Sequence, residues 1–401
     1  MYLDQEKTDE MVLNDEINTA VEEQMGFEYD ENDEDSLPDE EQPFNAESIR
    51  IDQQMLSLQY VYELYKDGSL KLNPGFQREF VWGRTKRALS LLIESLMLRI
   101  PIPAFYFYEN NDASFFVIDG RQRLTTAFDF IDNKFPLQKL EYLGATQNGK
   151  YFEDLEPKYQ QRIKRTQLAV NILDDRSPQE VIYDIFRRIN TGGMPLTPQE
   201  MRNSICSETV RSFLKDGAGC EEFKQATRKK IKDLRMDAQE MFLRYVTLYR
   251  KYDYNSHKLE KLQPSKLVYL MNNEMAEIEK LDDESREEIL KSFKVSMTRC
   301  YELFGDYAFS KIKLDESGET IIRPKDLINR SLFVAFSLLL ADPCFKNSNL
   351  ERYREKALRI CAEALTDPEY ERSISNATGD ERTIKVYLQK SREVLEKCDL
   401  Y

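Results

Sequence analysis

The spacing of apolar and polar residues predicts a mixed region of helices and strands that begins at Ile51 and ends near residue 200. Apolar residues recur at helical spacing in two segments, at Leu58, Val61, Leu64 and Tyr65 and again at Leu89, Leu92, Ile93 and Leu96. Gly68 ends the first of these helices, and a short extended piece follows through Leu72. Pro101 ends the second, because proline cannot continue a helix.

A β-hairpin is expected next. Residues 104–108 and 114–119 are rich in aromatic and β-branched side chains, and they flank the turn-forming residues Asn110-Asn111-Asp112. The second strand leads directly into Gly120 and then into another helix. The apolar face of that helix carries Leu124, Phe128 and Ile131.

Helical patterns dominate beyond residue 200. Before that point, a strand over residues 168–173 and a helix around residues 181–189 complete the mixed region. The helices expected after it cover residues 241–252, 266–281, 286–304, 324–340 and 350–365. The apolar run at residues 332–341 has about half the length of a membrane span, so it predicts a buried core helix. We therefore expect an α+β protein, with a mixed α/β domain followed by an α-helical domain.

The net charge of −15 comes from the first 50 residues. They hold 18 of the 72 acidic and two of the 57 basic residues, so the remainder is almost neutral. Such a segment cannot offset the entropy lost on ordering. We expect a disordered acidic tail over residues 1–48, the mixed domain over 49–204 and the helical domain over 205–401. The tail is either a solvating leader or a segment that competes with nucleic acid for a basic groove.

Cysteine usage and the N-terminus bear on the compartment. The six cysteines are widely spaced and form no Cys-x-x-Cys pair, and the chain does not begin with a basic and then apolar signal segment. These features predict a cytoplasmic protein with no membrane partner.

The strand-to-helix junction Asp119-Gly120-Arg121-Gln122-Arg123 is the main candidate site. The first turn of a helix offers N–H groups and a partial positive charge to an anion. Gly120 lets the backbone approach a ligand closely, while Arg121 and Arg123 add guanidinium groups suited to phosphate oxygens. Asp119 adds a carboxylate that can hold Mg²⁺ or orient an attacking water. An equally weighted alternative makes Asp119 a helix cap and pairs the arginines with surface carboxylates.

Four ordered motifs within residues 50–205 carry a resemblance to a known family. They are Asn73-Pro74-x-Phe76-Gln77-Arg78-x-x-Val81-Trp82, then Ile93-x-Ser95-Leu96 with Pro101-Ile102-Pro103, then Ile118 to Thr126, and finally Phe186-x-Arg188-Ile189-Asn190-Thr191-Gly192-Gly193-x-Pro195-Leu196. This stretch resembles the N-terminal domain of GmrSD-type modification-dependent restriction enzymes, a branch of the ParB and sulfiredoxin superfamily. The resemblance implies a ParB/sulfiredoxin-like fold for the mixed domain.

The same resemblance implies that the junction grips a nucleoside triphosphate, with Mg²⁺ as its companion. The family signature D-G-Q-Q-R is linked with nucleotide hydrolysis, and Asp119, Gly120, Gln122 and Arg123 match it. On this basis Asp119 and Gln122 are the catalytic candidates. Arg121 stands where the family usually has Gln. It keeps a hydrogen-bond donor but loses an acceptor, so phosphate binding should survive while a water-positioning role becomes doubtful.

Two further positions are carried over from the resemblance. Arg78 is assigned as a second phosphate or base contact, with a structural salt bridge as an equal alternative. Asn190, in a glycine-containing loop, is assigned as a ligand contact, against an equally weighted structural role. The loop leads to Thr197-Pro198-Gln199-Glu200, which has the pattern of a capping box at a helix start.

Two other features bear on nucleic acid. The densest basic run is Lys224, Arg228, Lys229, Lys230, Lys232 and Arg235. It fits a solvated helix face better than a contact with the phosphate backbone. His257 is the only histidine and lies in a polar stretch, so the histidine and metal-ligand pattern of an HNH nuclease is missing.

Together these features lead us to expect a nucleoside-triphosphate-binding protein of the restriction or anti-phage defence type. DNA is its candidate macromolecular partner, and cutting would fall to a separate nuclease or effector protein. Whether it hydrolyses the nucleotide stays open. The alternative is a non-enzymatic DNA-binding or adaptor protein with a ParB-like fold.

Overall fold

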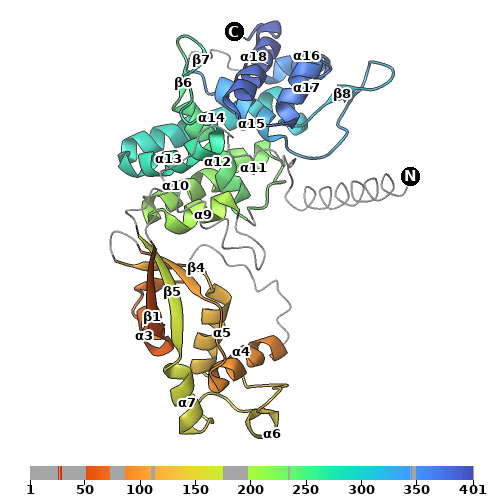
Figure 1. The fold of residues 1–401 in the computed structure, drawn as a ribbon. Coiled ribbons are helices and arrows are strands. Elements are labelled where there is room, and N and C mark those ends of the chain that lie inside the picture. The colour runs from red at the N-terminus through yellow and green to blue at the C-terminus, as the bar shows by residue number, and fades with distance from the viewer. Residues whose placement is uncertain are drawn as a thin grey trace, which may run out of the picture. The chain divides into compact units, whose positions relative to one another are not determined.

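The chain divides into two units, one spanning Gln42–Ile205 and the other Cys206–Tyr401 together with Met1–Glu41. Figure 1 shows the elements of each unit in chain order. The computed structural model describes residues 26, 28, 51–72, 86–109, 113–174, 197–233, 235–343, 345 and 349–400. Each unit has a separate hydrophobic core.

The first unit is built on a five-stranded sheet with the order β1-β5-β3-β4-β2. Its strands are β1 (Ile51–Ser57), β2 (Leu70–Lys71), β3 (Phe105–Glu109), β4 (Phe115–Asp119) and β5 (Gln167–Asp174). β1 pairs with β5 and β3 with β4 in the antiparallel sense, whereas β3–β5 and β2–β4 are parallel. The sheet is therefore mixed, as the expected fold class requires.

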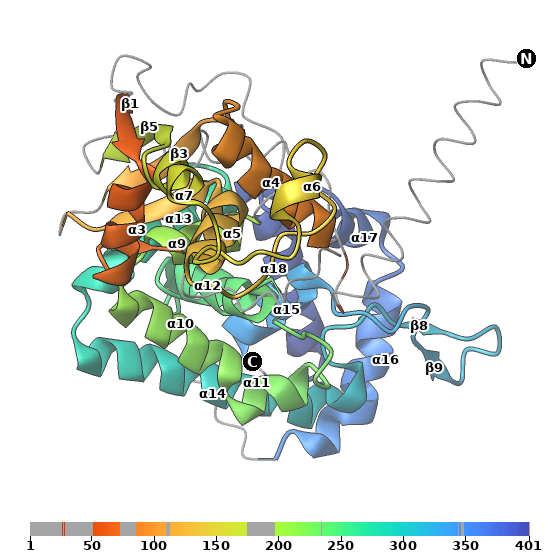
Figure 2. The same cartoon turned by 90° about the horizontal axis from the view of Figure 1, so that it is seen from below.

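Alternate residues of the strands serve two separate apolar layers. Phe107 and Val170 belong to the main core, which also contains buried residues of the helices on that face. These helices are α3 (Leu58–Lys66), α4 (Lys86–Leu98), α5 (Arg121–Ile131) and α7 (Pro157–Lys164), shown in Figures 1 and 2. Tyr108 and Ile118 point to the other face and pack with Met201 of α9 (Pro198–Ile205).

Most elements of the first unit follow from the sequence pattern, but β1 does not. It is an edge strand whose first five residues, including Asp52, are exposed, so it lacks the apolar alternation of a half-buried strand. The predicted helix begins only after it, at Leu58, with Ser57 as N-cap. The short helix α6 (Gly144–Gln147) and α7 were not indicated either. The helix expected around residues 181–189 and the hairpin turn at 110–112 lie outside the described residues.

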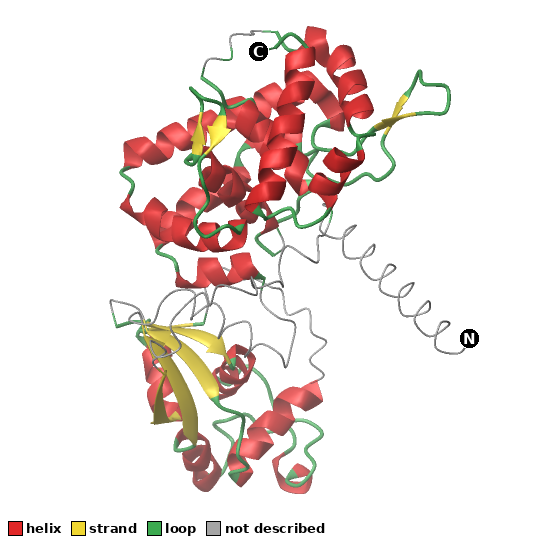
Figure 3. Ribbon diagram, turned by 45° about the horizontal axis from the view of Figure 1, so that its top comes forward, coloured by secondary structure: helices red, strands yellow, loops and turns green. Residues whose placement is uncertain are grey.

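Helices make up most of what is described of the second unit, as Figure 3 shows. They are α10 (Glu208–Gly219), α11 (Glu221–Ala226), α12 (Asp237–Tyr249), α13 (Leu267–Lys280), α14 (Asp283–Phe304), α15 (Arg330–Leu339), α16 (Arg354–Ala364), α17 (Pro368–Ser375) and α18 (Glu381–Lys397). Two short strand pairs accompany them, β6 (Tyr252–Asp253) with β7 (Lys258–Leu259) and β8 (Lys313–Leu314) with β9 (Ile321–Ile322). Every residue of α15 is buried, which confirms the predicted core helix. In the described parts of the chain, no helix is both long and apolar enough to cross a membrane.

The basic run between residues 224 and 235 does not form one helical face. α11 ends at Ala226, and Arg228 and Lys229 both have a φ of 55°. The Arg228 guanidinium donates to the carbonyl oxygens of Asp306 at 2.7 Å and Ala308 at 3.1 Å. The expected face is therefore wrong, because Arg228 ties two loops of the helical unit together.

Candidate functional site

The junction between β4 and α5 is a tight turn that only glycine can make. Asp119 ends β4, and Gly120 is the N-cap of α5 with a φ of 96°. A Cβ atom at this position would lie 2.2 Å from Cδ1 of Phe105 on the neighbouring strand β3. Both the left-handed backbone and the missing side chain are therefore required here.

Arg123, the third residue of α5, is held by four groups of the protein. Its Nη2 donates to Asp119 Oδ2 at 2.9 Å and to the carbonyl oxygen of Ala104 at 3.1 Å, and its Nη1 donates to the carbonyl oxygen of Pro103. The guanidinium carbon lies 4.5 Å from the centre of the Phe105 ring. Burial lowers the pKa of Arg123, while the Asp119 carboxylate opposes that change. Arg123 is thus a positioning residue that ties the entry of β3 to the start of α5.

Asp119 is oriented by Arg123 rather than by the helix. No side chain caps α5, so the alternative in which Asp119 is the cap is wrong. The Asp119 side chain is 37% exposed, and its second oxygen, Oδ1, makes no hydrogen bond to the described residues. Its carboxylate is thereby fixed through one oxygen, while the side chain stays partly exposed.

The remaining signature residues start α5. Arg121 is half-buried and Gln122 is exposed, and both lie in the first turn of α5. The predicted contacts Arg78 and Asn190 lie outside the described residues. Among the described residues, the predicted site residues at the junction are Asp119, Gly120, Arg121, Gln122 and Arg123.

One observation limits how the junction could hold a metal ion. Among the residues that the structure describes, no three His, Cys, Asp or Glu side chains form a cluster able to bind one. Asp119 would therefore supply a single carboxylate. That is enough for Mg²⁺ when substrate phosphates and waters complete its octahedral shell.

A β-bulge beside the junction could not be found from sequence. Tyr106 of β3 pairs with Asp119, whereas the next residue, Phe107, pairs with Val117, so β4 carries one extra residue here. Bulges often change the direction of a side chain next to a functional site. The strand pattern alone does not show where register is lost.

The capping box at α9 is confirmed. Thr197 N donates to Glu200 Oε2 at 2.7 Å, and Glu200 N donates to Thr197 Oγ1 at 3.1 Å. The sole histidine, His257, belongs to the helical unit, where its Nδ1 lies 3.6 Å from Oδ2 of the buried Asp342.

Comparison with known proteins finds one family that is similar to part of the chain. Residues 61–207 match the family described as GmrSD restriction endonuclease, N-terminal domain. The matched stretch contains the junction and strands β2 to β5. No curated protein and no solved structure matches the chain. Residues 61–207 are therefore similar to the N-terminal domain of GmrSD restriction endonucleases.

Proposed function

We propose that the protein binds a nucleoside triphosphate at the β4–α5 junction and works with DNA in restriction or anti-phage defence. The family of residues 61–207 supports the defence role. The observation that carries the nucleotide site is the junction itself. There a left-handed Gly120 opens the N-terminus of an eleven-residue helix beside a carboxylate that Arg123 holds in place.

Each residue has a distinct role in this proposal. The N–H groups of the first turn and the Arg121 guanidinium bind phosphate oxygens. The Asp119 carboxylate uses the oxygen that Arg123 does not bind to hold Mg²⁺ through water or to orient an attacking water, and Gln122 lies nearby in the first turn of α5. Arg123 acts through Asp119. Arg78 and Asn190 remain predicted contacts with the same ligand.

The decisive experiment measures phosphate release from each of the four ribonucleoside triphosphates with Mg²⁺, with and without DNA. Asp119→Asn should abolish turnover while the fold is kept, because the amide cannot replace the carboxylate at a metal ion. Asp129→Asn is the matched control, since Asp129 lies on α5, the helix that follows Asp119, and pairs with Lys134 at 2.8 Å. Equal turnover in the wild type and Asp119→Asn would refute the site.

The contacts of Arg123 make it a poor probe of ligand binding. Removing its guanidinium breaks hydrogen bonds to two carbonyl groups, so Arg123→Ala would lower stability as well as affinity. Arg121→Ala is the sharper test, and it should weaken nucleotide binding. Arg87→Ala is its control, because Arg87 is an exposed arginine paired with Glu141.

A second candidate function is a non-enzymatic DNA-binding or adaptor protein, and Arg121 is the feature that favours it. Arginine offers no acceptor to an attacking water, unlike the glutamine that the family usually has there. Nucleotide binding without turnover in the wild type would support this function. If Arg121→Gln then gained turnover, the lack of nucleotide hydrolysis in the wild type would be due to this one residue. Cutting of DNA would belong to a separate nuclease or effector protein, and plasmid left intact with Mg²⁺ or Mn²⁺ would agree with that.

A further inference from the structure

The acidic N-terminal segment makes a defined contact with the helical unit. Ile328 N donates to the carbonyl oxygen of Gly26 at 3.1 Å, and Glu28 N donates to the carbonyl oxygen of Ile328 at 2.9 Å. Gly26 is buried and has a φ of 83°, and a Cβ atom there would lie 2.2 Å from the carbonyl oxygen of Lys230. The segment therefore docks with its backbone, at a position that requires glycine.

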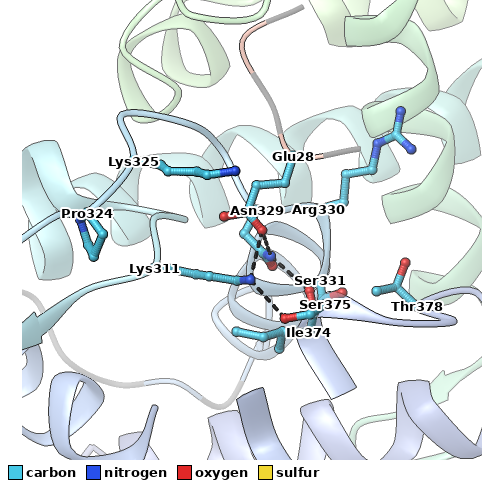
Figure 4. A pocket seen from close by; sticks show the side chains of 10 residues that line it. All are labelled: Glu28, Lys311, Pro324, Lys325, Asn329, Arg330, Ser331, Ile374, Ser375 and Thr378. Atoms are coloured by element: carbon cyan, nitrogen blue, oxygen red, sulfur yellow. Dashed lines mark hydrogen bonds and ion pairs between the residues drawn. The ribbon is translucent and has the colours of Figure 1, made fainter. Parts of the chain in front are cut away.

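This docking places the Glu28 carboxylate in a pocket of about 330 Å³. Glu28 Oε2 accepts a hydrogen bond from Asn329 Nδ2 at 2.7 Å and lies 3.1 Å from Lys311 Nζ. Lys311 also donates to Ser375 Oγ at 2.8 Å. Figure 4 shows these side chains meeting around the carboxylate. They come from the segment before β8, the N-cap of α15 and the last residue of α17.

The rest of the lining has the chemistry of an anion site. Lys325 and Arg330 add two more cations, and the hydroxyl-bearing residues Ser331 and Thr378 complete the polar side. Ser331 is only 2% exposed, and its Oγ has no hydrogen-bond partner among the described residues. Buried hydroxyl groups in proteins usually have a hydrogen-bond partner. The Ser331 hydroxyl could therefore donate a hydrogen bond to a ligand in this cavity.

Charge also favours an anion here. The Glu28 carboxylate lies 3.1 Å from Lys311 Nζ, nearer than the Glu371 carboxylate at 3.5 Å. An anion that replaced Glu28 would keep a negative charge beside Lys311 and could also accept from Ser331.

We propose that this pocket binds the phosphoryl group of a small molecule, and that Glu28 occupies it as an internal substitute for that ligand. The donors converge on one recess with Pro324 and Ile374 at its sides, whereas a nucleic-acid backbone needs cations along an extended surface. The volume lies at the lower end of small-molecule pockets, roughly 300–1,000 Å³. Ligand binding would displace the Glu28 side chain and with it the backbone contacts that Gly26 and Glu28 make with Ile328. This proposal does not rest on the nucleotide site of the first unit.

The test is calorimetric titration of inorganic phosphate into the full chain. Glu28→Gln keeps the size of the side chain but removes the competing charge. It should bind phosphate about tenfold more tightly than the wild type, the change expected for one charge-assisted hydrogen bond. Amide exchange locates the event, because phosphate should increase exchange at the Glu28 N–H of the wild type. Phosphate bound at the β4–α5 junction would leave that N–H unchanged.

Adding Lys311→Met to the Glu28→Gln variant should cancel the gain in phosphate affinity. Lys313→Met is its matched control, since Lys313 is an exposed lysine two residues away that does not line the pocket. If Lys311→Met fails to fold, Ser331→Ala takes its place and should weaken binding severalfold. Equal affinity in the wild type and Glu28→Gln would overturn the proposal, as would a gain that survives Lys311→Met. Glu28 would then be an anchor only. Displacement of phosphate by a DNA duplex, lost in Lys311→Met, would overturn the small-molecule assignment.

Discussion

Replacing Gly120 with alanine tests the account of the junction most directly. The variant adds one methyl group at a backbone φ of 96° and against the ring of Phe105, which is 1% exposed. Neither the strained backbone conformation nor the clash with the ring can be relieved without a large free-energy cost. The ring is packed in the core, and the chain on one side of Gly120 is fixed in β4 while the other side begins α5.

The expected loss has two parts. A left-handed conformation costs a residue with a side chain roughly 1–2 kcal/mol. Forcing a methyl group into a packed ring at 2.2 Å costs roughly 1–3 kcal/mol more. Gly120→Ala should therefore lower the free energy of unfolding by about 2–5 kcal/mol, a large share of the stability of an ordinary domain.

Gly149→Ala separates the two contributions. Gly149 belongs to the same unit and has a φ of 82°, but nothing lies within 4 Å of a Cβ placed there. It should therefore show the backbone cost alone. The free energy of unfolding of each variant can be measured by urea unfolding followed by circular dichroism. A loss in Gly120→Ala no larger than that in Gly149→Ala would refute the close packing of Phe105 on the junction.

Three further predictions concern other parts of the chain. Burial, reinforced by the Glu240 carboxylate, raises the pKa of Asp237 to about 6, so the folded state holds its proton more tightly than the unfolded state. The stability that this proton contributes is full below pH 3.8 and is lost as the pH rises through 6. Urea unfolding followed by circular dichroism gives the free energy of unfolding of the wild type and of Asp237→Asn. The difference between these two free energies should change by up to about 3 kcal/mol over that pH window. A difference that does not depend on pH would contradict the raised pKa. Thr197→Ala removes half of the capping box and should cost about 1 kcal/mol, seen as faster amide exchange in the first turn of α9, whereas Thr197→Ser should not. Gly217→Ala should destabilise the helical unit although alanine is the better helix former by about 1 kcal/mol, because its Cβ would lie 2.2 Å from the ring of the buried Phe242. A higher melting temperature for this variant would show that the ring can move aside.

The parts of the fold that sequence could predict are those determined by neighbours in the chain. The helix after Gly120 and the hairpin before it follow from local spacing, and both are confirmed. The capping box is confirmed for the same reason, since its two hydrogen bonds join residues three apart. The sequence pattern does not predict β1, because β1 is a strand through its pairing with β5, more than a hundred residues later.

The candidate site shows the same limit at the level of side chains. The D-G-x-Q-R pattern indicates which residues gather at the junction, but it does not indicate what Arg123 does there. Its partners include the carbonyl groups of Pro103 and Ala104, in the segment just before β3. The interpretation of Arg123 as a direct phosphate ligand stays a prediction, whereas its role in holding Asp119 is seen in the structure.

The edge position of β1 determines at which residue an expressed fragment of this domain should begin. Sequence similarity begins at residue 61, but the sheet begins at Ile51. A fragment designed from the similarity alone would lose all of β1 and the Ser57 cap of α3, and would leave the seven paired residues of β5 as a bare edge open to other chains. Expression trials should therefore start at or before residue 50, and a fragment starting at 61 is expected to self-associate.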